Sequence, residues 1–177
     1  GALGAALGTM VANLSTSKAG FEKYKEKLIN ISSKGQMTKD KLIKAIDDDT
    51  SAFDVVIKAM RMPKDTEEEK QLRNDKMQEG YKIATLVPLE TVENCKDALY
   101  ICKEISEIMD ESMASDVGSG ALMANAGAIS AAYNVRINLK SIKDNKFSSK
   151  TTTKLEKLLK DCENKLKTIL KNVEECL

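Results

Sequence analysis

Proline is nearly absent from this chain, and its scarcity constrains the fold more than any other feature of the sequence. Only Pro63 and Pro88 occur in 177 residues, and no run of alternating valine, isoleucine and threonine predicts a strand. Apolar residues instead recur at spacings of three and four, as on one face of a helix. We therefore expect an all-α, multi-helix bundle that occupies residues 1–177 as a single domain, since this length suffices to bury a substantial core.

The overall composition excludes several classes of function. The net charge is +1, aromatic residues make up 4% and tryptophan is absent, which argues against a nucleic-acid partner. No apolar stretch approaches the roughly 20 residues of a membrane span. Histidine is absent and the four cysteines form no CxxC pair, so we expect no metal site. Reduced thiols of this kind are typical of a cytoplasmic protein.

Two segments are rich in small residues. The opening segment, 1–14, and the nearly uncharged segment 120–139 repeat glycine and alanine at helical spacing. Glycine costs a helix about 1 kcal/mol relative to alanine, so its repeated use indicates that another backbone or a ligand approaches closely. We expect these helices to pack tightly, either inside the domain or against a partner subunit.

Prolines and capping residues predict where the remaining helices begin and end. We expect a helix over 39–62 that ends before Pro63, because proline disfavours helix in the residue before it. Asp65 or Thr66 would cap the next helix, which runs to about Leu86, and Pro88 suits the first turn of another. Ser115 and Asp116 would cap the segment that follows. We expect two further amphipathic helices, over residues 21–33 and 149–177.

Asp49 is the strongest candidate for acid–base chemistry. It lies three residues after Ile46 and four before Phe53, on the apolar stripe of the helix over 39–62. The stripe consists of Leu42, Ile46, Phe53, Val56, Ile57 and Met60. A carboxylate that faces a core or cleft loses hydration, which raises its pKa toward neutral pH. Because the chain has no histidine, such a carboxylate would replace the usual neutral-pH acid–base group. The alternative is that Asp49 belongs to a solvated run, Asp47–Asp49.

Asparagines interrupt the second small-residue segment. Asn134 and Asn138 share a helical face because they are four residues apart, and Asn125 lies nearer the middle of the segment. Buried amides need hydrogen-bond partners, which can be backbone, water or a ligand. No phosphate-binding glycine motif occurs, and a Ser-His-Asp or Cys-His arrangement is impossible without histidine.

Four ordered motifs carry a family resemblance. They read GALGAALGTMVANL, DDDTSAFDVVIKAMRMPKDTEEEKQLR, ATLVPLETVE and SDVGSGALMANAGAISAAYNVRINL. Together they resemble the formimidoyltetrahydrofolate cyclodeaminase and methenyltetrahydrofolate cyclohydrolase family over essentially the whole chain. The resemblance implies an all-helical homodimer with a folate cleft near the subunit interface. Family members carry a Pro-Gly-Gly-Gly-Ser element before the first motif, so we expect that this N-terminal segment of the site is missing here.

The resemblance also implies roles for particular residues. Asp49 corresponds to the family's acid–base carboxylate, with Asp47 as the nearest competitor on a different helical face. Arg61 and Lys64 lie in the following turn, where their cations would bind the glutamate tail of a folate, which can be polyglutamylated.

Three further residues would orient the pterin or the one-carbon unit: Asp116, Asn134 and Asn138. For each of them, capping or interhelical bonding is the structural alternative.

The reaction that the resemblance favours is cyclodeamination of 5-formiminotetrahydrofolate to 5,10-methenyltetrahydrofolate and ammonia. It would need no metal or redox cofactor, because the folate is the substrate. Hydrolysis of the methenyl compound to 10-formyltetrahydrofolate is the second interpretation, and a non-catalytic folate-binding or structural dimer is the third.

Overall fold

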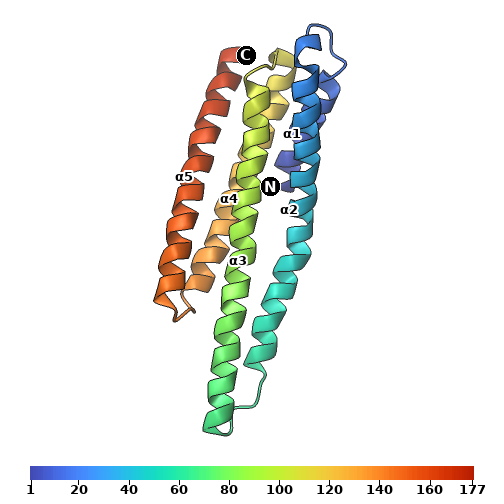
Figure 1. Ribbon diagram of the computed structural model, residues 1–177. Helices are drawn as coiled ribbons and strands as arrows, with labels where there is room; N and C mark the ends of the chain where they lie inside the picture. The colour runs from blue at the N-terminus through green and yellow to red at the C-terminus, as the bar shows by residue number, and fades with distance from the viewer.

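The computed structural model describes residues 1–177 as an all-helical protein without strands (Figure 1). Its elements in chain order are α1 (Ala2–Ser15), the short 3-10 helix η1 (Glu22–Tyr24), α2 (Lys25–Met60), α3 (Glu67–Ser106), α4 (Glu111–Leu139) and α5 (Asn145–Cys176). The all-α prediction is therefore confirmed. None of these helices is long and apolar enough to cross a membrane.

The long helices form an elongated bundle around α3 and α4. Helix α1 packs against α2, α3 and α4. Helix α5 packs against α3 and α4 and does not contact α1. Helices α2 and α4 do not contact each other. The hairpin formed by α2 and α3 extends past the other helices, at the end of the bundle opposite the C-terminus (Figure 1).

Several helix boundaries differ from the sequence prediction. The segments 21–33 and 39–62 are largely joined in α2, which runs without interruption through a buried Gly35. Thr9 of α1 packs at this glycine: a Cβ added there would collide with the Thr9 hydroxyl oxygen. Tertiary packing therefore stabilises α2 at a residue whose intrinsic helix propensity is poor.

Pro88 does not begin a helix but lies inside α3. Proline has no N–H, so the carbonyl of Ala84 four residues earlier lacks its helical donor. The side-chain amide of Asn138 donates to that carbonyl oxygen at 2.7 Å. This bond from α4 replaces the missing helical one and explains why α3 continues through the proline.

Helix α4 begins at Glu111 and α5 at Asn145, both earlier than predicted. Asp110 occupies the position before α4 in extended geometry, so Asp116 lies within the helix and is not a cap. Asp144 caps α5 by accepting from the backbone N–H of Phe147 at 3.0 Å. The predicted start of α3 is confirmed, because Thr66 and Glu69 form a reciprocal capping box.

The small-residue segments pack against each other within one chain. A Cβ added at Gly4 of α1 would lie 2.5 Å from the carbonyl oxygen of Gly120 in α4, closer than real Cβ atoms approach. Ala124 and Ala128 of α4 are fully buried. The close approach predicted for these glycines is thus confirmed, and its partner is another helix of the same chain.

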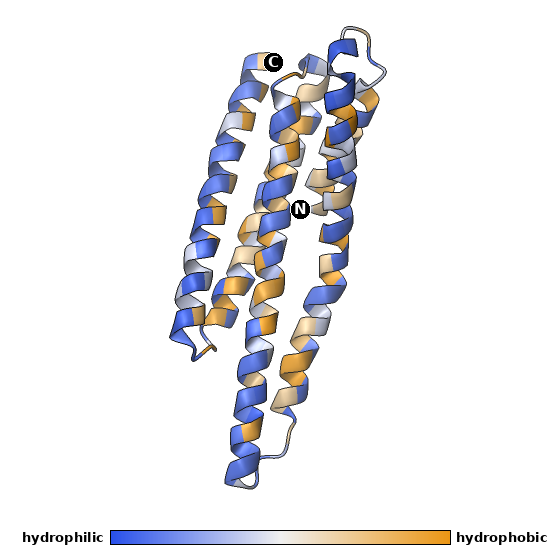
Figure 2. Ribbon diagram, viewed as in Figure 1, coloured by the Kyte–Doolittle hydropathy of each residue, from blue (hydrophilic) through white to orange (hydrophobic).

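Large apolar side chains of α1 and α4 remain exposed. We call this surface the α1/α4 face, and it consists of Leu3, Met10, Leu14, Leu122, Met123, Ile129, Tyr133 and Ile137. No charged residue occurs in α1 or between Val117 and Val135 of α4. Figure 2 shows apolar colours along these two helices and a mostly hydrophilic α5.

Candidate functional site

The position where α1 begins gives a reference level from which the candidate site can be located. Gly1 packs between three helices: a Cβ added to it would lie 2.6 Å from the sulfur of Cys95 in α3 and 3.3 Å from Leu42 in α2. A Cβ added at Gly127 of α4 would lie 2.7 Å from the Gly1 nitrogen. Leu42, Cys95 and Gly127 therefore lie at one level of the bundle.

The register of the three helices places two of the predicted residues at a common level, two turns beyond this one. Asp49 follows Leu42 by seven residues and Asn134 follows Gly127 by seven, so each keeps its predecessor's side of the helix about 10 Å further on. Helix α3 runs in the opposite direction, which brings Pro88 to the same level. Since α2 and α4 do not touch, Asp49 and Asn134 flank α3 from its two sides.

The next turn of the same helices adds three residues, Phe53, Ala84 and Asn138. The side chain of Asn138 is hydrogen-bonded to the Ala84 carbonyl oxygen. We call the six residues the Asp49 site: Asp49, Pro88, Asn134, Phe53, Ala84 and Asn138.

Asp49 is exposed in the single chain, which corrects the expectation that its stripe is buried. It does share the core-facing side of α2, because Leu42 and Val56, seven residues before and after it, are both buried. Ile46, on the same predicted stripe, is nevertheless exposed. The same side of α2 therefore faces the core at Leu42 and Val56 but faces solvent at Asp49. The single chain does not remove the Asp49 carboxylate from water.

Phe53 is a site feature that the sequence did not distinguish from the core. Its ring lies one turn after Asp49, and 52% of the residue is exposed. Helical spacing gives the side of a residue but not whether another element covers that side. An exposed ring beside a carboxylate offers a planar ligand a stacking surface.

The two predicted amides differ in their surroundings. Asn138 is half-buried and its N–H group is used by the Ala84 carbonyl, which supports the structural alternative for this residue. Asn134 is exposed and makes no side-chain hydrogen bond, so its amide is free to bind a ligand.

Arg61 and Lys64 lie at the tip of the α2–α3 hairpin. Arg61 follows the last residue of α2, and both side chains are exposed. Twelve residues separate Arg61 from Asp49, a distance of about 18 Å along a helix axis. These cations are therefore accessible to the far end of an extended ligand, not to its reacting atoms.

Asp116 is the predicted site residue that the chain does not bring to the Asp49 site. It lies on the same side of α4 as Asn134 but 18 residues earlier, about 27 Å away along the helix. There it lines a groove of about 330 Å³ with Val11, Leu14 and Lys18.

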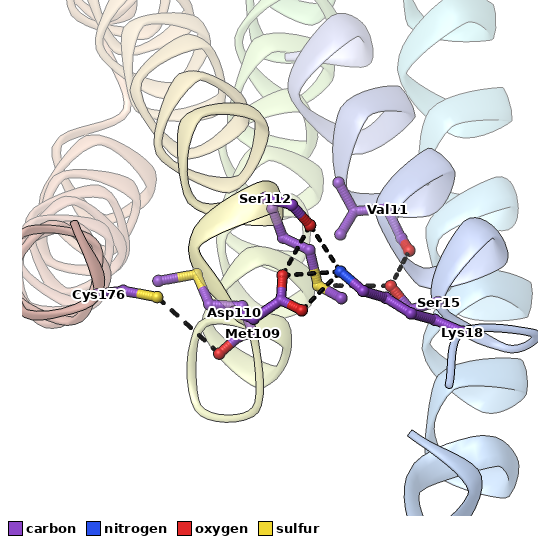
Figure 3. Close-up of polar contacts among 8 residues, drawn as sticks. Val11, Ser15, Lys18, Met109, Asp110, Ser112 and Cys176 are labelled. Carbon is purple, nitrogen blue, oxygen red and sulfur yellow. Dashed lines mark hydrogen bonds and ion pairs between the residues drawn. The ribbon is translucent and has the colours of Figure 1, made fainter. Parts of the chain in front are cut away.

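An ion pair organises the end of the molecule where Asp116 lies (Figure 3). The Lys18 ammonium donates to Asp110 at 2.6 and 2.8 Å and to the Ser112 hydroxyl at 2.6 Å. The hydrogen bonds that Asp110 accepts from Lys18 and from the Ser112 hydroxyl, the latter at 2.7 Å, lower the pKa of Asp110 below its usual value. Lys18 thereby joins the segment after α1 to the start of α4.

Three of the four cysteines are buried thiols with raised pKa values. Burial raises the pKa of Cys102 to about 12 and that of Cys162 to about 11, so both are unreactive thiols near neutral pH. No group of three or more Cys, Asp and Glu side chains has an arrangement suited to a metal ion.

Fold and site together define an all-helical protein with an exposed carboxylate, an exposed amide and an exposed aromatic ring near one level of the bundle. A family model described as formiminotransferase-cyclodeaminase matches residues 1–157. The chain belongs to this family.

Similar proteins carry both activities that the motifs suggest. A methenyltetrahydrofolate cyclohydrolase from Methylorubrum extorquens is 38% identical over 159 residues, which cover 90% of this chain and 76% of that protein. A formimidoyltransferase-cyclodeaminase from Gallus gallus is 33% identical and matches 98% of this chain, but this chain spans only 32% of that relative's length.

The crystal structure of formiminotetrahydrofolate cyclodeaminase from Thermotoga maritima superimposes with a TM-score of 0.88. Its sequence is 27% identical, and the match covers 98% of this chain and 83% of that one.

Proposed function

We propose that this protein is an acid–base enzyme that makes or breaks a bond at the one-carbon unit between N5 and N10 of a tetrahydrofolate. The observation that carries the proposal is the common level of Asp49 and Asn134 on either side of α3, which combines a proton carrier with a free amide. Membership of the formiminotransferase-cyclodeaminase family supports the folate substrate.

Cyclodeamination of 5-formiminotetrahydrofolate is the first candidate reaction. N10 attacks the formimino carbon and closes a five-membered ring, after which the former imino nitrogen leaves as ammonia. Asp49 would accept the N10 proton and deliver a proton to the departing nitrogen, which is otherwise a poor leaving group. The products are 5,10-methenyltetrahydrofolate and ammonia. The Thermotoga maritima and Gallus gallus relatives support this candidate.

Hydrolysis of 5,10-methenyltetrahydrofolate is the second candidate, favoured by the 38% identical relative from Methylorubrum extorquens. Here Asp49 would take a proton from water as its oxygen attacks the methenyl carbon. The bond from that carbon to N5 then breaks as the proton of the new hydroxyl group passes to N5, and 10-formyltetrahydrofolate results. Both candidates use the same carboxylate on the same carbon, so they require similar binding groups.

The remaining residues of the site suit the rest of a folate. The exposed ring of Phe53 would stack on the pterin, and the free amide of Asn134 would bind its polar edge. Arg61 and Lys64 would bind the glutamate tail, including a polyglutamate, since their ammonium and guanidinium groups suit carboxylates. Neither reaction needs a metal or redox cofactor.

We also infer that the enzyme is a homodimer that works in the cytoplasm. The uncharged α1/α4 face exposes eight large apolar side chains, and contiguous apolar surfaces of this kind are typical of protein interfaces. Four unpaired cysteines support a reducing compartment.

Near-ultraviolet absorbance distinguishes the candidates. The protein is mixed separately with 5-formimino- and 5,10-methenyltetrahydrofolate, and ammonia is measured in the first mixture. Methenyl formation with ammonia release identifies a cyclodeaminase. Faster loss of the methenyl compound, with no reaction in the first mixture, identifies a cyclohydrolase. No reaction in either mixture contradicts the proposal and supports a non-catalytic folate-binding or structural dimer.

A further inference from the structure

We propose that the groove between α2 and α3 binds a free α-amino acid with an apolar side chain. The groove has a volume of about 350 Å³, at the lower end of the range of small-molecule sites. Asp48 and Ala52 line it, whereas Asp49 and Phe53 lie about 100° further around α2. Binding in the groove is therefore independent of the proposed folate chemistry.

The register of α2 and α3 orders the chemical groups along the groove. Leu42 and Cys95 both pack at Gly1. Lys41 and Asn94 each precede one of these two residues by one position, so they lie near one level. The two helices run in opposite directions (Figure 1). A residue that follows Lys41 by a given number of positions therefore lies opposite the residue that precedes Asn94 by the same number.

Small side chains on α2 make the groove hollow. A step of four residues along each helix brings Ala45 opposite Glu90, and both line the groove. A step of eleven residues brings Ala52 opposite Ile83 in the same way. Each alanine presents only a methyl group to the opposite helix, so space remains between the helices. Ala52, Ile83 and Val87 give this half of the groove an aliphatic wall, which suits an apolar side chain because contact with it removes that side chain from water.

Asn94 is the residue that indicates a ligand. Only 6% of it is exposed, and its side chain forms no hydrogen bond within the chain. Ser148 is the only residue with a fully enclosed side-chain polar atom that lacks a partner, so the Asn94 amide is open to the groove that it lines. A buried amide without a partner costs free energy, which a hydrogen-bonding ligand recovers.

Two charges of opposite sign flank this amide, and neither forms an ion pair. Lys41 lies near the level of Asn94, and Glu90 lies one helical turn away. The other acidic residue of the groove, Asp48, is already paired with Lys44 at 2.5 Å. The groove thus offers a free cation, a free amide and a free carboxylate at one end.

A zwitterion satisfies all three groups at once. The Lys41 ammonium and the Asn94 N–H group would bind the carboxylate of an amino acid, and Glu90 would accept from its ammonium group. A simple carboxylic acid would leave Glu90 without a partner, and a simple amine would leave Lys41 without one. The side chain of the amino acid would then extend along the aliphatic half of the groove.

Isothermal titration calorimetry of the whole chain with L-leucine tests the proposal. We expect saturable binding with a dissociation constant of about 1 mM or lower. Each of three control compounds lacks one recognised group: glycine lacks the apolar side chain, 4-methylpentanoate lacks the ammonium group and 3-methylbutylamine lacks the carboxylate. Each should bind about tenfold more weakly or worse. No binding of L-leucine, or equal binding of all four compounds, overturns the proposal and leaves water as the partner of the Asn94 amide.

Two substitutions test whether L-leucine binds in this groove. Asn94→Leu keeps the approximate size of the side chain but removes the amide, so binding should weaken about tenfold while the melting temperature stays equal or rises. Glu90→Gln changes an exposed residue, so it should weaken binding without affecting the fold. Glu68→Gln is the matched control, because Glu68 is exposed on α3 outside the groove. Wild-type binding in both groove variants overturns the assignment.

Asp49→Asn separates this proposal from the proposed function. The variant should bind L-leucine as the wild type does, whether or not the wild type is active on a folate. Loss of L-leucine binding in Asp49→Asn would show that the groove is not a separate site, and would overturn the proposal.

Discussion

Asp49 is distinguished from its two neighbours by the side of α2 on which it lies. We expect Asp49→Asn to lower kcat by about a hundredfold or more, the usual contribution of a general acid–base group. Far-ultraviolet circular dichroism should be unchanged, because the substituted residue is exposed. Asp48→Asn is the matched control: Asp48 lies a third of a turn away and forms an ion pair with Lys44. Near-normal kcat in Asp49→Asn would reject the assignment.

Asn138 is expected to matter for stability because of Pro88. Asn138→Ala leaves the Ala84 carbonyl without a donor, which should lower the free energy of unfolding by about 1–2 kcal/mol. In a Pro88→Ala background the restored backbone N–H can reach that carbonyl, so Asn138→Ala should cost much less. Denaturant unfolding of the four proteins in this cycle measures the coupling. Equal costs in both backgrounds would show that the amide does not replace the helical bond.

At the scale of elements, glycine content decides how closely α1 approaches α4. Gly4→Ala should destabilise the protein by about 1–3 kcal/mol, because the added methyl group collides with the Gly120 carbonyl oxygen. Gly118→Ala is the matched control on α4: its Cβ would meet Val173 at an ordinary 3.5 Å. That substitution should be neutral or stabilising, since alanine favours helix by about 1 kcal/mol. Thermal unfolding measures both, and equal melting temperatures would contradict the close packing.

The helices could be predicted from their periodicity better than their boundaries could. Apolar residues recur at helical spacing after Pro88, and all six of them are buried, because local spacing fixes which residues share a side: Leu89, Val92, Cys95, Leu99, Cys102 and Ile105. The start of a helix at Pro88 was wrong, since only a long-range bond from Asn138 makes a proline tolerable there. Asp49 shares a side of α2 with the buried Leu42 and Val56, but its exposure depends on which other elements cover α2. Such nonlocal facts are absent from any short window of sequence.

At the scale of the whole molecule, the α1/α4 face connects assembly with activity. Ile129→Lys places a charge in the middle of this apolar surface, and we expect the dimer to dissociate because the ammonium would lose its hydration in the interface. Activity should fall with it if the Asp49 site is complete only in the dimer. Ile29→Lys is the matched control: Ile29 is 53% exposed but lies on α2, outside the α1/α4 face.

Sedimentation velocity and activity, measured at the same protein concentrations, separate assembly from folding. Ile129→Lys should sediment as a helical monomer, whereas Ile29→Lys should remain dimeric and active. Because the loss of activity would follow dissociation, raising the concentration of Ile129→Lys should restore dimer and turnover together. A fully active monomer would mean that one chain holds a complete site and that activity does not depend on assembly.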